Sequence, residues 1–445
     1  MSFRRINDDI LRALQAPGPA YFVGVGLALA VLAWGIYGWW YQVEVGLGVA
    51  GYQPPILWAV YITNFVFWVG ITHSGTLVSA VLLLCRARWR TGVARASEAM
   101  TVFAIMTAGL FPIIHLGRPW YFYWLFPYPN QRGLWVNFRS PLIWDVFAIA
   151  SYLTVSALFL YLGLVPDIAA ARDRIQDWRR RVYRALALGW QGTDRQWRHL
   201  NSLYGFLAAL VTPLAVSVHS VVSWDFAVSI TPGWHSTIFA PYFVAGAIFS
   251  GVAMMMTLLI VMRTMLRLED YLPVGHFENL AKLTIPMSLI LTYVYATEFF
   301  IAWYSGNPFE RATLIDRATG SYAPLFWIMV CCNSIVPLLF FFKRVRTDLR
   351  ALFAISILIN IGMWLERFVL IVSSLAHSFD PAEWTGLYHP TWVEAAITAG
   401  AFAWFFLLFL LFVKNFPVVS MTELKELSAV VGATGASPAA REVPS

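Results

Sequence analysis

The chain has 445 residues, of which 59% are hydrophobic and 12% are charged, against roughly 45–50% and 25% in an average soluble domain. This composition is typical of an integral membrane protein. Three cysteines and no Cys-x-x-Cys-His motif exclude a disulfide scaffold, a zinc ribbon, a cysteine-bound iron–sulfur cluster and an attached c-type haem.

Ten segments are apolar over about 20 residues, which is the length that a helix needs to cross a bilayer. They cover residues 20–41, 56–84, 98–117, 142–164, 200–223, 238–262, 281–304, 322–342, 350–376 and 391–413. The first segment is too long for a signal peptide, and no small-residue cleavage site follows it. We therefore predict an all-α integral membrane protein with about ten transmembrane helices.

The basic residues alternate between the connections of these helices. Of the 31 Lys and Arg residues, 25 fall on one side, five fall on the other, and Arg367 lies inside the ninth segment. By the positive-inside rule, both termini are cytoplasmic. The net charge of +7 thus reports orientation, and we expect no nucleic-acid partner. The outer connections 120–141 and 224–241 are rich in aromatic residues, and we expect part of them to pack beneath another subunit.

Five ionisable residues fall near the outer ends of their helices. A rise of about 1.5 Å per residue puts His115 roughly 4–5 Å and Asp145 roughly 6 Å below the outer surface, with His219 about 9 Å deeper than Asp225. The tenth segment begins near Thr391, so Glu394 also lies near the outer face. Charged groups in the bilayer are costly and are therefore functional candidates.

Such a band of imidazoles and carboxylates suits the oxidation of a lipid-soluble quinol, which must lose two protons as well as two electrons. A neutral His or an ionised carboxylate within hydrogen-bonding reach of each hydroxyl accepts those protons. Arg118 and Arg139 lie beside the band and either anchor helix ends or hold a carboxylate ionised.

A second set of polar residues lies deeper, and comprises His73, Glu298, Asn360, Glu366 and Arg367. Glu366 and Arg367 point about 100° apart on one helix, so their pairing cannot be assumed. Two interpretations remain open for this set: polar contacts that hold helices together, or a proton-conducting chain that also includes Glu394.

A b-type cytochrome is a further alternative, with His115 and His219 as axial ligands. The accompanying carboxylates favour an acid–base site instead. We expect no covalent or metal-bound cofactor in this chain, and therefore a redox partner that carries the electrons away.

Three segments, His115–Pro119, Trp135–Asp145 and Ser217–Asp225, resemble the polysulfide-reductase membrane-subunit family, also called NrfD-like. Among its members, the chain most resembles the quinol-site membrane subunit of bacterial alternative complex III. The resemblance implies catalytic roles for His115 and Asp145. It places His219 and Asp225 in the family's other characteristic segment. Our hypothesis adds Arg118 and Arg139 to the quinol-binding residues, where one of them would hold the carboxylate ionised.

The resemblance also implies two four-helix bundles flanked by the first and last helices. We divide the chain into a cytoplasmic N-terminal segment, the first helix with its outer loop, the quinol-site bundle, the second bundle, the last helix and a mobile cytoplasmic tail. These units cover residues 1–19, 20–55, 56–223, 224–376, 377–414 and 415–445.

The implied function is quinol oxidation within a complex in the bacterial inner membrane, with menaquinol the expected substrate and proton translocation a possible companion. The implied partners are c-type haem subunits, an outer-face iron–sulfur subunit, a paralogous NrfD-like membrane subunit and membrane lipid. The alternative functions are a paralogue that translocates protons without a quinol site, and the b-type cytochrome.

Overall fold

The computed structural model describes residues 3–12, 14, 18–87, 89–130, 132–377, 379, 381, 384 and 387–434. These residues form helices and no β-strand, and ten of the helices are long and apolar enough to cross a membrane. The predicted all-α membrane fold is therefore confirmed.

The ten spans are α2 (Pro19–Val45), α3 (Val60–Leu84), α4 and α5 (Arg90–Ala108, Leu110–His115), α6 (Pro141–Arg172), α8 (Asp194–Ala227), α9 (Phe239–Met265), α10 (Val274–Ser305), α12 with the turns after it (Ala323–Val330, then Cys331–Ile335 and Val336–Phe341), α14 (Leu349–Leu375) and α15 (Trp392–Asn415). The shorter helices are α1 (Phe3–Arg12), α7 (Arg179–Leu186), α11 (Pro308–Thr319), α13 (Lys343–Arg346) and α16 (Met421–Thr434), with 3₁₀ turns at Leu47–Val49, Pro119–Leu125 and Val136–Arg139.

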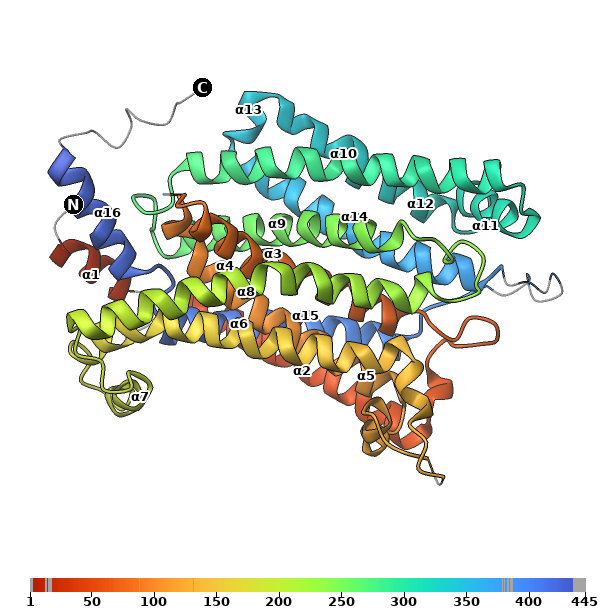
Figure 1. Cartoon of the computed structure of the whole chain (residues 1–445), viewed down its shortest axis with the longest axis horizontal. Helices are drawn as coiled ribbons and strands as arrows, with labels where there is room; N and C mark the ends of the chain where they lie inside the picture. The colour runs from red at the N-terminus through yellow and green to blue at the C-terminus, as the bar shows by residue number, and fades with distance from the viewer. Residues whose placement is uncertain are drawn as a thin grey trace.

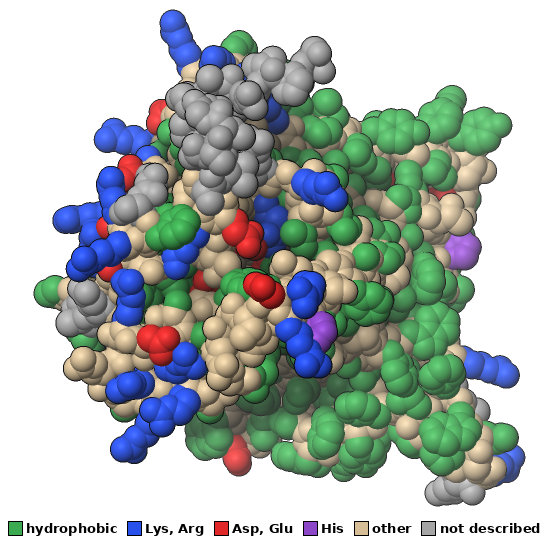
Figure 2. All heavy atoms as spheres, turned by 60° about the vertical axis from the view of Figure 1, so that its left-hand side comes forward, with side chains coloured by type: hydrophobic (Ala, Val, Ile, Leu, Met, Phe, Trp, Pro, Cys, Tyr) green, Lys and Arg blue, Asp and Glu red, His purple; other side chains and the backbone are tan. Residues whose placement is uncertain are grey.

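The spans run along the long axis of an elongated bundle (Figure 1). Helices α1, α7 and α16 lie at one end, whereas α5 and α11 lie at the other. Basic side chains crowd the end that carries α1 and α16, and hydrophobic side chains cover the flank beside it (Figure 2). This distribution agrees with the orientation that the basic residues predict, and we call the two ends the inner and the outer end.

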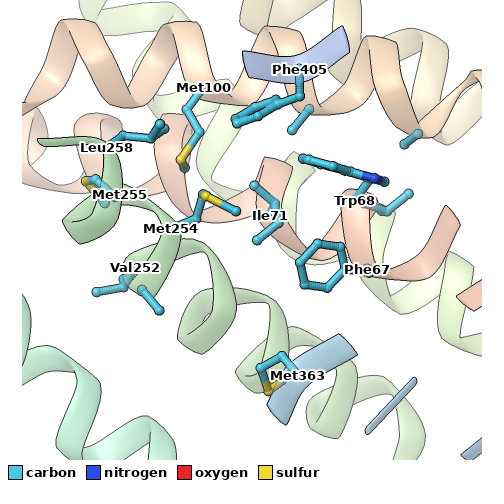
Figure 3. Close-up of a cluster of buried hydrophobic side chains, with 14 of the residues drawn as sticks. Phe67, Trp68, Ile71, Met100, Val252, Met254, Met255, Leu258, Met363 and Phe405 are labelled. Carbon is cyan, nitrogen blue, oxygen red and sulfur yellow. The ribbon is translucent and has the colours of Figure 1, made fainter. Parts of the chain in front are cut away.

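Helices α3 and α9 form the centre of the bundle and are buried along most of their length. Large side chains fill the space between them and their neighbours, among them Trp68 of α3, Met254 and Met255 of α9 and Phe405 of α15 (Figure 3). Burial of one such side chain contributes about 1.5–3 kcal/mol to the stability of a protein in water. In lipid, close packing of the side chains stabilises the contacts between helices instead.

The spans contact one another in two groups. Helices α3, α4, α6 and α8 pack together, as do α9, α10, α12 and α14, and the groups meet where α3 contacts α9. Helices α2 and α15 pack against each other at the side. The domain boundaries given above stay a prediction.

A glycine pair sets the close approach of α2 to α15. A Cβ atom built on Gly35 would lie 2.6 Å from the Cα atom of Gly400, and one built on Gly400 would lie 2.7 Å from the Cα atom of Gly35. Small residues at helix contacts allow this approach in membranes, where tight packing stabilises helix pairs.

The first part of the expected tail is helical and docked. Val418, Val419 and Met421 are buried, and the backbone N–H of Thr422 donates to Asp167 at 3.2 Å. These apolar and polar contacts hold the start of the tail against the bundle. The mobility of the tail stays a prediction, and residues 435–445 lie outside the described part.

Candidate functional site

The polar residues of the outer end are organised around the end of α5. His115 is its last residue, and Gly117 follows with a φ of 71°, a left-handed conformation that ends helices and favours glycine. The side chain of Gln42 donates to the carbonyl of Ile114 at 2.9 Å, which joins this helix end to α2.

One ring nitrogen of His115 faces a tyrosine. The Nδ1 atom lies 3.4 Å from the hydroxyl of Tyr52, and the two rings meet edge to face with centroids 5.6 Å apart. The hydroxyl oxygen of Tyr52 also accepts from the backbone N–H of Tyr61 in the first turn of α3. If Nδ1 carries the hydrogen toward Tyr52, Nε2 keeps its lone pair and can accept a proton.

The phenol of Tyr52 stays protonated, because burial and the nearby carboxylate of Glu394 raise its pKa well above the usual value. Its ring also stacks near that of Tyr388, with centroids 6.5 Å apart. The hydroxyl of Tyr388 donates to Glu394. A continuous set of contacts therefore runs from His115 to the start of α15.

Glu394 makes hydrogen bonds that stabilise the start of α15. Its Oε2 atom accepts from the backbone N–H groups of Gly51 and Thr391, both at 3.0 Å, and Thr391 completes a capping box of the kind that stabilises helix starts. The predicted part of Glu394 in a proton path stays a prediction, and these contacts give the residue a structural role.

Two carboxyl groups meet at the outer ends of α6 and α8. The side chains of Asp145 and Asp225 lie within reach of a hydrogen bond to each other, and the Oδ1 atom of each is buried without a hydrogen-bond partner among the described residues. Because two carboxylates repel and neither carries a donor, such a bond requires one proton between them. The structure thus brings together two of the predicted pocket residues.

The two predicted arginines stand apart from this pair. Arg118 and Arg139 are both exposed, and within the described residues neither makes an ion pair with Asp145 or Asp225. No hydrogen bond or ion pair joins His115 to Asp145 either, within the same part of the chain. The outer end therefore offers His115 and the Asp145–Asp225 pair as two separate acceptors at the ends of neighbouring spans.

His219 lies with the deeper set rather than beside His115. Its ring centroid is 4.5 Å from that of His73, and the ring of Tyr152 stacks on His73 at 5.1 Å. The Nε2 atom of His73 and both ring nitrogens of His219 are buried without a well-formed hydrogen bond to the part of the chain that the structure describes.

This contact bears on the haem alternative. Two imidazole nitrogens that bind one metal ion from opposite sides are about 4 Å apart, so the ring centroids of an axial pair lie farther apart than those of His73 and His219. The predicted axial pair, His115 with His219, is not brought together. The imidazole contacts of the structure give the haem alternative no support.

The deeper set continues into the second group of helices. The guanidinium carbon of Arg367 lies 4.3 Å from the ring centre of Phe243, which itself contacts His219 with ring centroids 5.7 Å apart. An Arg367 nitrogen lies 3.1 Å from Oε1 of Glu366. The pairing that the helical angle left open is therefore made, between two side chains that are both buried.

The other oxygen of Glu366 accepts from Tyr295 and from Asn333, the latter at 3.4 Å. Nearer the outer end, Glu298 pairs with Arg317 at 3.7 Å. The fifth member of the deeper set, Asn360, donates to the carbonyl of Ser356 at 2.8 Å. This side chain therefore bonds within its own helix.

Sequence reasoning missed a cluster of buried charges at the inner end. Arg95 lies between Glu98 at 3.5 Å and Asp167 at 3.2 Å, and Arg90 pairs with Glu423 of α16 at 2.7 Å. Both arginines count among the 25 basic residues of the inner connections, where solvated side chains are expected. The i,i+3 spacing of Arg95 and Glu98 is the signal in the sequence that points to their pairing.

The sequence comparisons assign this architecture to a family. The model of the family described as "Polysulphide reductase, NrfD" matches residues 48–377. The chain belongs to the NrfD family. The matched region contains both groups of four spans, and it leaves α2, α15 and α16 outside.

Two proteins are similar to this NrfD chain over most of its length. A protein of Halobacterium salinarum, named as a putative membrane subunit of dimethyl sulfoxide reductase, is 27% identical over 399 residues, which cover 84% of this chain and 86% of the relative. An "Hdr-like menaquinol oxidoreductase integral membrane subunit" from Archaeoglobus fulgidus is 20% identical over 445 residues, which cover 96% and 99%. Both names describe membrane subunits, in agreement with the ten spans of this chain.

Proposed function

We propose that this protein is the membrane subunit through which a quinol-oxidising complex removes protons and electrons from quinol near the outer membrane face. The observation that carries the proposal is the outer-end arrangement of His115, with Nδ1 facing Tyr52, and the proton-sharing pair Asp145–Asp225. The relative from Archaeoglobus fulgidus, named as a menaquinol oxidoreductase subunit, supports quinol as the ligand.

Oxidation of quinol to quinone releases two protons and two electrons. His115 accepts one hydroxyl proton at Nε2, and the unprotonated carboxylate of the Asp145–Asp225 pair accepts the other. Bases in position for such transfers typically accelerate a reaction about 10²–10⁴-fold. The two electrons pass to an iron–sulfur cluster in a partner subunit, since the proposed site supplies proton acceptors only.

The partner docks on the outer aromatic loop, which we define as residues 119–138. Trp120, Trp124 and Trp135 are all about half exposed there, and aromatic residues are enriched where protein interfaces are buried. A soluble surface would rarely leave so many aromatic rings uncovered.

We further propose the alternative-complex-III arrangement, with c-type haem subunits and a paralogous NrfD-like membrane subunit, on the motif segments His115–Pro119, Trp135–Asp145 and Ser217–Asp225. The substrate is menaquinol and the location the bacterial inner membrane, with both termini in the cytoplasm. The gathering of basic side chains at the end with α1 and α16 supports this orientation.

The test is quinol-dependent reduction of the partner's clusters in the purified complex. The variant His115→Gln should assemble normally and reduce the clusters at least about 100-fold more slowly. The matched control is His199→Gln, which changes an exposed histidine of α8 at the inner end. An unchanged rate in His115→Gln would show that the quinol reacts elsewhere.

Proton translocation is a second candidate function, favoured by the unpartnered buried atoms of the deeper set. These are Nε2 of His73, both ring nitrogens of His219 and Nη2 of Arg367, which lack a well-formed hydrogen bond within the described residues. Buried polar atoms without partners are rare, and internal water that bridges them satisfies them. Water and imidazoles in one row would conduct protons between the two groups of spans.

A further inference from the structure

A groove of about 440 Å³ lies between α2, α9 and α15 toward the inner end. Its walls are apolar side chains of the two long spans, including Leu258 and Val261 of α9 and Phe406, Phe409 and Leu410 of α15. Val261 is 40% exposed, so the groove opens on the side of the bundle, where the spans face lipid.

The groove runs parallel to the bilayer normal for part of the membrane. On α9 its lining extends from Thr257 to Met265, which corresponds to about 12 Å of helix. The hydroxyl of Thr257 already bonds Ser356 at 2.8 Å. Because this hydroxyl already has a partner and the walls of the groove are apolar, the groove suits a hydrocarbon chain.

The inner end of the groove is basic. Arg267 follows α9 by two residues, Lys414 is the second-last residue of α15, and Arg12 ends α1, and all three line the groove. No Asp or Glu of the described residues lines it. Arg12 shares its charge with Asp9 at 2.6 Å, whereas Arg267 is exposed and forms no ion pair with the described part of the chain.

We propose that this groove is a binding site for an anionic phospholipid. An acyl chain lies along the apolar walls, and the phosphate sits among Arg267, Lys414 and Arg12 at the membrane surface. Basic pockets between spans on the cytoplasmic side bind the headgroups of such lipids, and each basic residue strengthens binding about fivefold.

Charge distinguishes this occupant from the other lipids of a membrane. A zwitterionic phospholipid carries no net charge for the three basic residues to attract, and a quinone has no anionic group. The groove is also remote from the quinol chemistry, because it lies at the inner end while His115 and Asp145 lie at the outer end. The proposal therefore stands whether or not the chain oxidises quinol.

The test is native mass spectrometry of the purified complex after exchange into detergent with phosphatidylglycerol or phosphatidylcholine. We expect the membrane subunit to retain one phosphatidylglycerol and to retain phosphatidylcholine at least about fivefold less. Arg267→Gln should lower retention of phosphatidylglycerol about fivefold. The matched control, Arg344→Gln, removes an exposed arginine of α13 and should leave retention unchanged.

A second variant fills the groove without changing its charge. Val261→Trp should abolish retention of phosphatidylglycerol, whereas Leu289→Trp, at a position of α10 that is 48% exposed, should not. Equal retention of the two phospholipids would overturn the proposal. So would full retention of phosphatidylglycerol in both Arg267→Gln and Val261→Trp, or a quinone in place of the phospholipid.

Discussion

The imidazole rings of His73 in α3 and His219 in α8 are in contact, with centroids 4.5 Å apart, and both side chains are buried. Two imidazolium ions at this separation would repel each other strongly in a medium of low dielectric. At most one of the two rings is therefore an imidazolium at a time, and in the proposed proton path a proton that enters on one ring leaves through the other.

We expect His219→Phe to uncouple proton movement from electron transfer. The phenyl ring fills the space beside Phe243, so the bundle should assemble, while the second proton acceptor is lost. Reconstituted in vesicles, the variant complex should move fewer protons per electron than the wild type, as read from a pH-sensitive dye during quinol oxidation. An unchanged ratio of protons to electrons would remove the pair from any proton path.

Hydropathy predicted the ten spans, because that signal depends on composition over about 20 residues and not on packing. The orientation that the basic connections indicate stays a prediction. Depth was harder to predict. Counting residues from helix ends placed His219 with His115, whereas the structure places it with His73. Helices that begin at different heights or tilt in the membrane break the link between sequence position and depth.

Contacts between distant segments could not be predicted from the sequence, for a different reason. The partners of His115 and Glu394 are Tyr52 and Tyr388, which lie in loops whose course no periodic pattern specifies. Asp145 and Asp225 were recognised one by one, since each is a rare charge near a helix end, but only the packing of α6 on α8 brings them together as the proposed proton-sharing pair.

The carboxyl pair predicts a specific loss in Asp145→Asn. The amide can still bond Asp225, so the local structure should persist, but the pair no longer accepts and releases a proton. We expect kcat for quinol oxidation to fall about 10²–10⁴-fold, with a much smaller change in KM. Stopped-flow reduction of the complex measures both, and Glu269→Gln, at an exposed position of the inner end, serves as the control. A normal kcat would show that the pair is structural.

The buried charge cluster predicts a large loss of stability in Arg95→Met. Glu98 and Asp167 would then lie buried with one partner fewer each, and removing one member of a buried ion pair costs about 3–5 kcal/mol. Arg174→Met is the matched control, because Arg174 pairs with Asp8 at the surface, where an ion pair contributes about 1 kcal/mol or less. Thermal unfolding of both variants in detergent compares them. Equal melting temperatures would contradict the structural role of the cluster.

The contact of α2 with α15 predicts which glycines tolerate a side chain. Gly35→Leu should separate the two helices, because a Cβ atom at residue 35 already meets the backbone of Gly400 at 2.6 Å. Gly26→Leu, on the same helix, meets nothing within 4 Å and should be tolerated. Protease sensitivity of α2 in membranes reports the separation, and equal resistance of the two variants would argue against this packing.

The hydroxyl of Tyr52 predicts a positioning effect on His115. Tyr52→Phe keeps the ring that packs against His115 and Tyr61, but it removes the oxygen that faces Nδ1. The imidazole is then free to place its hydrogen on Nε2, where it cannot accept a quinol proton. Loss of an orienting partner of this kind typically costs about 10–100-fold, and we expect the loss in kcat with little change in KM.

The pH profile tests whether Tyr52 acts as the protonated phenol. Burial and Glu394 raise the pKa of Tyr52, so the phenol stays protonated at any pH below about 10. The ratio of wild-type to Tyr52→Phe rates should therefore not follow a Tyr52 ionisation anywhere in that range. Tyr37→Phe, at a position of α2 that is 52% exposed, is the matched control. A Tyr52→Phe enzyme with normal kcat would mean that another group sets the tautomer of His115.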